Sequence, residues 1–399
     1  MDDRKQSSNG AGDGPEGAED RALRLSRRRL LGGALAAGPA LAALHEVVPH
    51  QGIHDALGGD QHPNAVAAAA GHTGHAVPGH VNGVGTAGPT FRGGATVDHE
   101  ANGFNPTEIL RDFDYGKTRR LASGRVLREW ELIAADKEIE VAPGVRYPAW
   151  TYDGRIPGPT LRCREGDRLR IRFVNGSEHP HTIHFHGLHP SLMDGIPGVG
   201  AGIIPSGGST VYEFDAEPFG LHLYHCHVAP LAEHIARGMY GTFVVDPKEG
   251  RSDADEMVMV QHGYNTTFDA EGNQLYAVNG IPFHYMAEPI QVNRNELVRI
   301  YLVNVLEYDP INSFHIHGNF FNYFPTGTRL EPTEFTDTVI QGQAQRGICE
   351  MTFPHAGPFM FHAHKTEFAE LGWMGFFDVS DARRESRFAP PAEANFEVE

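Results

Sequence analysis

Short runs of β-prone residues alternate with turn residues from about residue 125 onward. Gly, Pro, Asn and Asp separate the runs, and amphipathic helical patterns are scarce. The runs are 169–174, 209–214 and 242–245 in the first half, and 290–304, 347–353 and 376–379 in the second. Regular short strands with turn signals are typical of β-sandwiches. The pattern therefore predicts an all-β protein.

A polar and charged stretch divides this β-rich part in two. Residues 246–256 read D-P-K-E-G-R-S-D-A-D-E and contain no apolar run. Such composition is typical of a boundary between domains. We therefore predict one β-domain over residues 101–247 and a second over residues 248–399.

The N-terminal residues have the features of an export signal. Residues 26–31 read S-R-R-R-L-L, and an apolar run continues to Leu44, with the small-residue pattern Ala40-Leu41-Ala42. These features predict a twin-arginine signal peptide over residues 1–44, and hence a periplasmic, cell-surface or secreted protein. A membrane anchor is the alternative. Gly and Pro interrupt the short run, which favours cleavage.

Residues 45–100 are rich in His, Ala and Gly and show no apolar periodicity. This composition predicts a disordered linker. Its imidazoles could hold copper weakly, although a solvated linker without a ligand explains the composition equally well.

Charge and cysteine content narrow the function classes. The formal net charge of −18 argues against a nucleic-acid partner, which requires a basic surface. The 3 cysteines do not make a disulfide framework. Cys163 and Cys349 lie in strand-like runs, where a small buried hydrophobic residue is expected, and a disulfide between them stays open. Cys226 lies between two histidines.

The two halves repeat one histidine pattern. In each half a strand-like run ends in H-x-H-G, a long loop follows, and a second run ends in another H-x-H. The pairs are His184 and His186, His225 and His227, His315 and His317, and His362 and His364. The spacing indicates an internal duplication with a domain-sized period of about 135 residues.

This spacing indicates metal binding. Residues i and i+2 of a strand project to the same face, so each pair presents two imidazoles side by side. A lone buried histidine is more often structural. Four matched pairs are hard to explain in that way, because each core imidazole needs its own hydrogen-bond partners.

The loop after Cys226 indicates which metal. His234 follows eight residues after the cysteine and Met239 five residues later, and His181 precedes the first H-x-H-G. A thiolate, two imidazoles and a weak axial thioether compose a blue-copper site. Zinc also binds Cys and His, but its structural sites use compact C-x₂₋₄-C spacings, which are absent from the sequence.

At these residues the chain resembles the multicopper oxidases, across roughly residues 125–380. The resemblance implies two cupredoxin-like Greek-key β-sandwich domains and four coppers per chain. It implies that the type 1 copper ligands are His181, Cys226, His234 and Met239. It implies that His184 and His315 bind the type 2 copper, and that the type 3 pair is bound by His186, His225, His227, His317, His362 and His364.

The second half lacks the blue-copper ligands. Asn312 occupies the position equivalent to His181, Ala363 replaces the cysteine, and Phe368 stands where a histidine follows in the usual family loop. The chain therefore resembles the two-domain group of the family, with its type 1 site in the first domain. In that group adjacent subunits supply the cluster ligands, which implies a homotrimer with clusters at the subunit interfaces.

The resemblance implies a laccase-like oxidase. Such an enzyme couples the one-electron oxidation of a phenol, an aromatic amine or a metal ion to the four-electron reduction of O₂ to water. Asp194 resembles the family's acid beside the cluster, and Glu367 is a second candidate for proton delivery; a structural role explains either carboxylate equally well. The sequence does not identify the reducing substrate. Cu(I), Fe(II) and Mn(II) are candidates as well as the aromatic donors.

Two alternatives remain. Copper nitrite reductases share the architecture, but they have Asp where this chain has His184 and lack a histidine at the position of His227. Eight cluster imidazoles also exceed the needs of a single catalytic copper. A copper-binding or storage protein is the non-enzyme alternative, but it has no use for a cysteine joined through the backbone to two cluster ligands.

Overall fold

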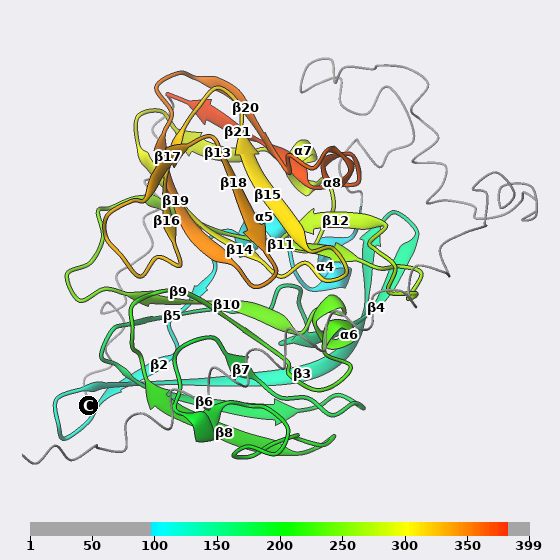
Figure 1. Cartoon of the computed structure of the whole chain (residues 1–399), viewed down its shortest axis with the longest axis vertical. Coiled ribbons are helices and arrows are strands. Elements are labelled where there is room, and N and C mark those ends of the chain that lie inside the picture. The colour runs from blue at the N-terminus through cyan, green and yellow to red at the C-terminus, as the bar shows by residue number, and fades with distance from the viewer. Residues whose placement is uncertain (1–96, 382–399) are drawn as a thin grey trace, which may run out of the picture. The chain divides into compact units, whose positions relative to one another are not determined.

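The computed structural model describes residues 97–381. The predicted signal peptide lies outside the described residues, as does the predicted linker up to residue 96, and both stay predictions. Within the described range, strands form four sheets and helices are few and short (Figure 1). None of the helices in this range is long and apolar enough to span a membrane. The all-β prediction is confirmed.

The first half of the described chain forms two five-stranded sheets, here called domain 1. One has the strand order β1-β5-β10-β9-β7, and the other has the order β2-β3-β6-β8 with β4 paired to β3. The bounds are β1 Phe113–Asp114, β2 Lys117–Arg120, β3 Val126–Ala142, β4 Val145–Tyr152, β5 Thr160–Arg164, β6 Arg168–Asn175, β7 His184–Phe185, β8 Ser209–Asp215, β9 Gly220–His225 and β10 Tyr240–Asp246.

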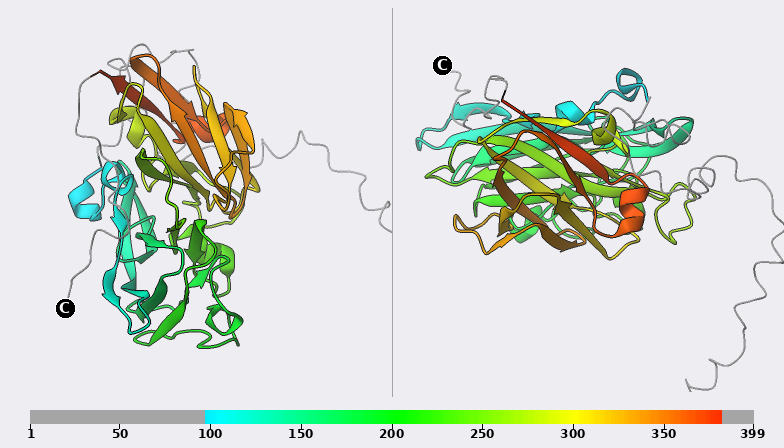
Figure 2. Two further views of the ribbon diagram at one scale, coloured as in Figure 1. Left: turned by 90° about the vertical axis from the view of Figure 1, so that its left-hand side faces the viewer. Right: turned by 90° about the horizontal axis from the view of Figure 1, so that it is seen from above.

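The second half forms two further sheets, here called domain 2. Their orders are β12-β11-β14-β19-β16-β17 and β13-β21-β20-β15-β18. The bounds are β11 Asp255–Tyr264, β12 Leu275–Val278, β13 Ile290–Asn293, β14 Leu297–Asn304, β15 Ile311–Ile316, β16 Phe321–Pro325, β17 Glu334–Thr336, β18 Thr338–Gly342, β19 Arg346–Thr352, β20 Gly357–His362 and β21 Met374–Ser380. Within residues 97–381 no sheet mixes strands of the two domains, and the left view of Figure 2 shows the two domains as separate groups of strands.

The two domains repeat one pairing pattern. β3 pairs with β6 in parallel, as β11 does with β14, and β5 pairs with β10 in parallel, as β13 does with β21. The antiparallel ladders from β10 through β9 to β7 recur as those from β21 through β20 to β15. The internal duplication inferred from the histidine pairs is therefore a duplication of the fold.

Alternating side chains explain the individual strands. In β6 the sequence R-L-R-I-R-F places Leu169, Ile171 and Phe173 in the core, while the arginines lie on the other face. There Arg168 and Arg170 pair with Glu213 of β8. The run predicted over 290–304 forms two strands, β13 and β14, because the backbone turns at Asn295 with φ of 62°.

Apolar packing and buried charges join the domains. One buried cluster combines Val141 and Leu223 of domain 1 with Val260 and Tyr301 of domain 2. Beside it, Glu256 accepts hydrogen bonds from Arg162 at 2.7 Å and from Arg299 at 2.8 Å. Burial alone would raise the pKa of Glu256, but the two guanidinium groups outweigh burial and lower it.

Short helices complete the described chain. They are α4 His99–Asn102, α5 Pro106–Ile109, the 3₁₀ helix η3 Ser191–Met193, α6 Leu231–Ala236, α7 His284–Ala287 and α8 Thr366–Glu370. Helix α4 begins within the last residues of the predicted linker, and Val97 is buried. Cys163 and Cys349 are free and buried in different core clusters, so they do not form a disulfide.

Candidate metal centres

His181, Cys226 and His234 meet in the interior of domain 1. His181 follows β6 and forms a β-bridge with Ile204, Cys226 follows directly on β9, and His234 lies on α6. The sulfur of Cys226 lies 3.7 Å from His181 Nδ1 and 3.3 Å from His234 Nδ1, and the two Nδ1 atoms are 3.1 Å apart. Ligands that are each roughly 2.0–2.3 Å from one ion have about this separation. The three side chains therefore fit one metal ion.

The surroundings of this site suit metal ligation. Ser177 Oγ lies 3.0 Å from His181 Nε2 and donates a hydrogen bond to Asp136, so His181 donates from Nε2 and leaves Nδ1 free for a metal. Burial and the neighbouring His234 lower the pKa of His181 to about 3, which keeps the ring neutral. Met239, the predicted axial ligand, is fully buried, and its carbonyl oxygen accepts a hydrogen bond from Cys226 N at 3.0 Å.

Trp150 packs against the same site from the side of β4. Its ring lies 4.7 Å from the ring of His234 and 5.5 Å from that of His181. The guanidinium of Arg237 stacks over Trp150 at 4.7 Å. The sequence identifies neither residue as part of the site. Trp150 comes from β4, which has no histidine pattern, and Arg237 follows α6 between His234 and Met239 but is not a metal-ligand type.

A set of four histidines lies next to this site. His184 and His186 come from β7 and its end, and His225 and His227 flank Cys226. His186 Nε2 lies 2.9 Å from His225 Nε2, and the His184 ring lies 5.4 Å from the His227 ring. This group, the domain 1 set, is thus joined to the first site through the backbone of Cys226.

Acceptors around the domain 1 set leave the Nε2 atoms available. His184 Nδ1 lies 2.9 Å from the carbonyl oxygen and 2.8 Å from Oδ1 of Asp194, and His225 Nδ1 lies 2.8 Å from the carbonyl oxygen of Cys226. Because these oxygens only accept, each Nδ1 carries a proton and each Nε2 offers a lone pair. Thr182 Oγ1 accepts from the backbone N–H of His227 at 3.0 Å.

The same arrangement recurs in domain 2. His317 Nε2 lies 3.0 Å from His362 Nε2, and the His315 ring lies 5.1 Å from that of His364. These four residues are the domain 2 set. Equivalent acceptors hold it: His315 Nδ1 lies 3.0 Å from the carbonyl oxygen of Asp337, and His362 Nδ1 lies 2.7 Å from that of Ala363. Ser313 takes the place of Thr182 by accepting from His364 N at 2.8 Å.

Domain 2 has no counterpart of the cysteine site. The buried Asn312 accepts a hydrogen bond from Ser313 N at 2.8 Å, and Ala363 is fully buried. Phe368 stacks on Tyr276 with ring centroids 3.8 Å apart. Asn312, Ala363 and Phe368 therefore stand in domain 2 where domain 1 has its thiol and imidazoles or where a further histidine is expected.

The two histidine sets stay apart within one chain. Among the described residues, no group of three or more donors lying within 4.8 Å of one another combines a histidine of the domain 1 set with one of the domain 2 set. Both sets reach the surface, since His317 and His364 are exposed, and His184, His186 and His227 are half-buried. A cavity of about 510 Å³ beside the domain 2 set is lined by His315, His317, Phe320 and Phe335, among others.

The two carboxylates predicted to deliver protons differ in placement. Asp194 contacts His184 as described, and its Oδ1 also lies 3.5 Å from Nε2 of His189, a residue that the histidine-pair pattern does not include. Glu367 lies on α8 with its side chain 64% exposed, and its nearest charged neighbour is Lys365, at 3.7 Å. The structure brings only Asp194 to the histidines.

Comparisons with known proteins agree with this geometry. Two family models, both described as multicopper oxidase, match residues 134–250 and 253–383. A crystal structure described as a multicopper oxidase is 64% identical to the chain, with a TM-score of 0.70. That match covers 71% of this chain and 100% of the other.

The chain is also similar to copper-containing nitrite reductases. The one from Neisseria meningitidis is 34% identical over 228 residues, which cover 51% of this chain and 57% of that protein. The match thus spans little more than half of this relative. The structure of the copper nitrite reductase from Nitrosomonas europaea is 25% identical, with a TM-score of 0.60, and the match covers 67% of this chain and 98% of that one.

Proposed function

Because this chain belongs to the multicopper oxidase family, we propose that it is a laccase-like enzyme that oxidises a small reducing substrate one electron at a time and reduces O₂ to water. The observation that carries the proposal is the position of Cys226. Its side chain belongs to the buried His–Cys–His site, while its neighbours His225 and His227 belong to the domain 1 set. A few covalent bonds therefore join the two centres.

The predicted ligands suit copper. Thiolate and imidazole are donors that copper prefers, and in each set one pair of Nε2 atoms lies close together, at 2.9 Å in domain 1 and 3.0 Å in domain 2. Copper, when bound, supplies the one-electron redox chemistry and the reduction of O₂. The protein holds the imidazoles in one tautomer and keeps Cys226 and His181 buried. We propose four coppers per chain, one at the cysteine site and three in a cluster.

We propose that the cluster forms between chains. One chain presents two separate sets of four histidines, and apolar side chains are exposed beside each. Phe335, 68% exposed, lines the cavity at the domain 2 set, and Ile340, 70% exposed, lies two residues along β18 from Thr338, which contacts His315. Leu192, 68% exposed, lies two residues before Asp194 at the domain 1 set. A second copy of the chain, as in a homotrimer, would cover these surfaces and unite the sets.

A cavity of about 270 Å³ near the cysteine site is a candidate site for the electron donor. Its lining includes Tyr147, Glu233, Arg237 and Phe268. Arg237 stacks on Phe268 at 4.9 Å and on Trp150, which contacts His234. Aromatic walls and one cation suit a small phenol or aromatic amine, and a metal-ion donor stays open.

Copper counting, electron paramagnetic resonance and oxygen uptake test the function together. The proposal expects four coppers per chain, an intense blue absorption, and oxygen consumption when a phenol or an aromatic amine is added. Two coppers per chain without oxygen uptake would overturn it.

Nitrite reduction is the alternative that the comparisons support, since several curated relatives are copper-containing nitrite reductases. The same preparation, given nitrite and a reducing dye without oxygen, distinguishes the two. Production of nitric oxide at a rate comparable to oxygen uptake would favour the alternative.

A further inference from the structure

Two histidines and a glutamate meet at a place remote in sequence from the predicted copper ligands. His99 opens α4, His284 opens α7, and Glu288 follows the end of α7. One donor atom from each lies within 4.8 Å of the others. None of the three belongs to the cysteine site or to either histidine set.

The donors at this place are incompletely satisfied. His99 Nδ1 is buried and has no hydrogen-bond partner within residues 97–381. His284 is 2% exposed, and its ring lies 5.1 Å from that of His99 at 74°. Burial, with a smaller contribution from His99, lowers the pKa of His284 to about 3, so its imidazole is neutral at physiological pH. A buried imidazole nitrogen without a partner is costly unless a ligand satisfies it.

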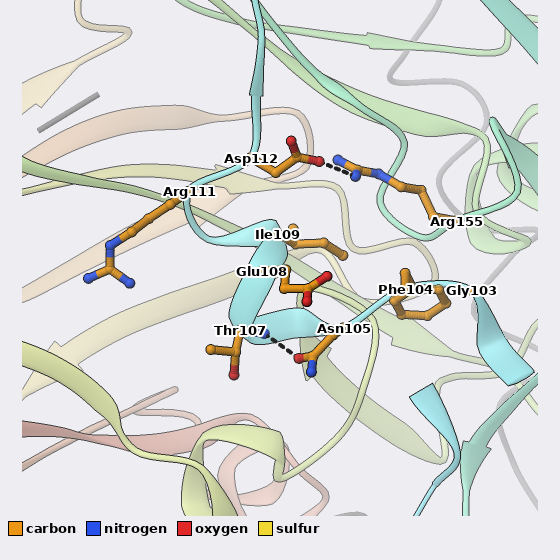
Figure 3. A pocket seen from close by; sticks show the side chains of 9 residues that line it. All are labelled: Gly103, Phe104, Asn105, Thr107, Glu108, Ile109, Arg111, Asp112 and Arg155. Carbon is orange, nitrogen blue, oxygen red and sulfur yellow. Dashed lines mark hydrogen bonds and ion pairs between the residues drawn. The ribbon is translucent and has the colours of Figure 1, made fainter. Parts of the chain in front are cut away.

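Thr107 and Glu288 complete the surroundings. Thr107 Oγ1 lies 2.8 Å from His284 Nε2 and 3.2 Å from Glu288 Oε2, and Glu288 Oε2 lies 3.7 Å from His284 Nε2. Thr107 is held at the beginning of α5, because its backbone N–H donates to the side chain of Asn105 at 2.9 Å (Figure 3). A carboxylate therefore faces the imidazoles of His284 and His99.

We propose that His99, His284 and Glu288 form a further metal site that binds one divalent transition ion, Zn²⁺ or Cu²⁺, apart from the copper centres. Two imidazoles and one carboxylate are a donor set for these ions, and Thr107 Oγ1, which lies beside His284 and Glu288, is a candidate fourth partner. Calcium and magnesium, which prefer oxygen donors alone, do not fit.

The position of the site gives it a structural role. On one side, Asn102 of α4 donates to the carbonyl oxygen of Glu140 in β3 of domain 1 at 2.8 Å. On the other side, Tyr285 of α7 in domain 2 donates to the carbonyl oxygen of Pro106 at 2.8 Å. A metal on His99 and His284 would therefore fasten the N-terminal segment, which contacts both domains, to domain 2.

Metal analysis of the full-length, copper-loaded protein tests the proposal. Wild type, His99→Ala, Glu288→Gln and the control His355→Ala are equilibrated with Zn²⁺, desalted and analysed for total copper plus zinc per chain. His355 is an exposed histidine in the loop between β19 and β20, outside every donor group described above. Each variant differs from wild type at one residue and keeps every predicted copper ligand. A difference in metal content between His99→Ala or Glu288→Gln and the control His355→Ala therefore reports on this site.

Wild type and His355→Ala are expected to hold one more metal ion per chain than His99→Ala. Glu288→Gln should bind that ion at least ~10-fold more weakly. Zn²⁺ should raise the melting temperature of wild type but not that of His99→Ala. Equal metal content in wild type, His99→Ala and Glu288→Gln would overturn the proposal. The blue absorption should be the same in all four, which separates this test from the proposed oxidase function; if His99→Ala does not fold, Glu288→Gln decides alone.

Discussion

Asp194 is the acidic side chain with the most direct contact to the histidine sets. Replacing Asp194 by Asn removes the negative charge that orients His184 and is available to relay protons. Oxygen turnover is therefore expected to fall ~10- to 100-fold, the usual effect of losing a group that orients a metal ligand. The blue absorption should not change, because Asp194 does not contact His181, Cys226 or His234.

Glu367→Gln is the matched control for this prediction. Its side chain is largely exposed and close only to Lys365, so turnover should stay within twofold of wild type, since no histidine loses a partner. Slow turnover in Glu367→Gln together with normal turnover in Asp194→Asn would show that Glu367, and not Asp194, delivers protons.

Glu307 is expected to make stability depend on pH. Burial raises the pKa of this carboxyl to about 7, from 4.5 in a solvated chain. The folded state then keeps a proton that the unfolded state loses, so this contribution to stability is complete below about pH 4.5 and is lost as the pH rises through about 7. Glu307→Gln removes the cost of keeping an ionised carboxylate partly buried. It should therefore raise the free energy of unfolding on the order of 1 kcal/mol above neutral pH.

Urea denaturation of both proteins across this pH range measures the effect. The difference between variant and wild type should grow with increasing pH. A difference that is constant with pH would show that Glu307 ionises normally.

Single residues also show which parts of the site can be predicted from the sequence. The histidine pairs and Cys226 are predictable because ligand pairs have a fixed spacing along a strand. Trp150 and His189 are not, because the loops and strands that bring them to the ligands have no repeating pattern. Asp337 could have been found by comparing the halves, since it holds His315 through its carbonyl oxygen as Asp194 holds His184.

Strands β5, β11 and β14 meet at the buried carboxylate of Glu256. Arg162 and Arg299 both donate to it, and Tyr301 donates at 2.7 Å. Glu256→Gln leaves the two buried guanidinium groups without their shared counter-charge. Arg162 still pairs with Asp246, and Arg299 still pairs with Glu350. We expect a loss of about 1–3 kcal/mol in the free energy of unfolding, because the buried network loses one negative charge and the charge-assisted hydrogen bonds made to it.

An exposed ion pair provides the control. Glu138 pairs with Arg146, and both side chains are more than 60% exposed. Glu138→Gln should change the free energy of unfolding by less than about 1 kcal/mol. Similar losses in the two variants, measured by urea denaturation, would contradict the role given to the Glu256 network.

The alternation of apolar and polar residues predicts the strands well where one face is buried, as in β6. It fails where strands are buried on both faces or are very short. β11, Asp255–Tyr264, is buried along its whole length, and β7 has two residues, so neither has a readable period. The short helices α4 and α5 also escape prediction, because four residues contain too little of a helical repeat.

At the scale of the whole molecule, the exposed apolar side chains beside the domain 2 set should decide assembly. The double variant Phe335→Glu and Ile340→Glu places two charges where another chain is proposed to pack. It should sediment as a monomer and lose oxygen uptake, because the histidine sets no longer meet. The blue absorption should remain, since the cysteine site lies within one domain.

Ile133→Glu is the control, because Ile133 is 41% exposed in a sheet that carries none of the predicted copper ligands. It should keep the assembly of the wild type. A double variant that keeps both assembly and activity would show that Phe335 and Ile340 are not part of the interface.

The architecture and the two-domain family were predictable from the duplicated histidine pattern, because duplication of the ligands accompanies duplication of the fold. Assembly follows less directly. The sequence alone shows eight imidazoles but not where they lie. The structure shows that, within one chain, His186 and His225 belong to one group of donors and His317 and His362 to another.

Complementation between two inactive variants tests the shared cluster most directly. His186→Ala damages the domain 1 set, and His317→Ala damages the domain 2 set, so each protein alone should show no oxygen uptake. Co-expressed, they can form interfaces in which an intact domain 1 set from one chain meets an intact domain 2 set from another. Random mixing should restore about a quarter of wild-type oxygen uptake, because one interface in four is then intact. Oxygen uptake that stays at zero in properly assembled mixed oligomers, or full activity in either variant alone, would contradict a cluster built between chains.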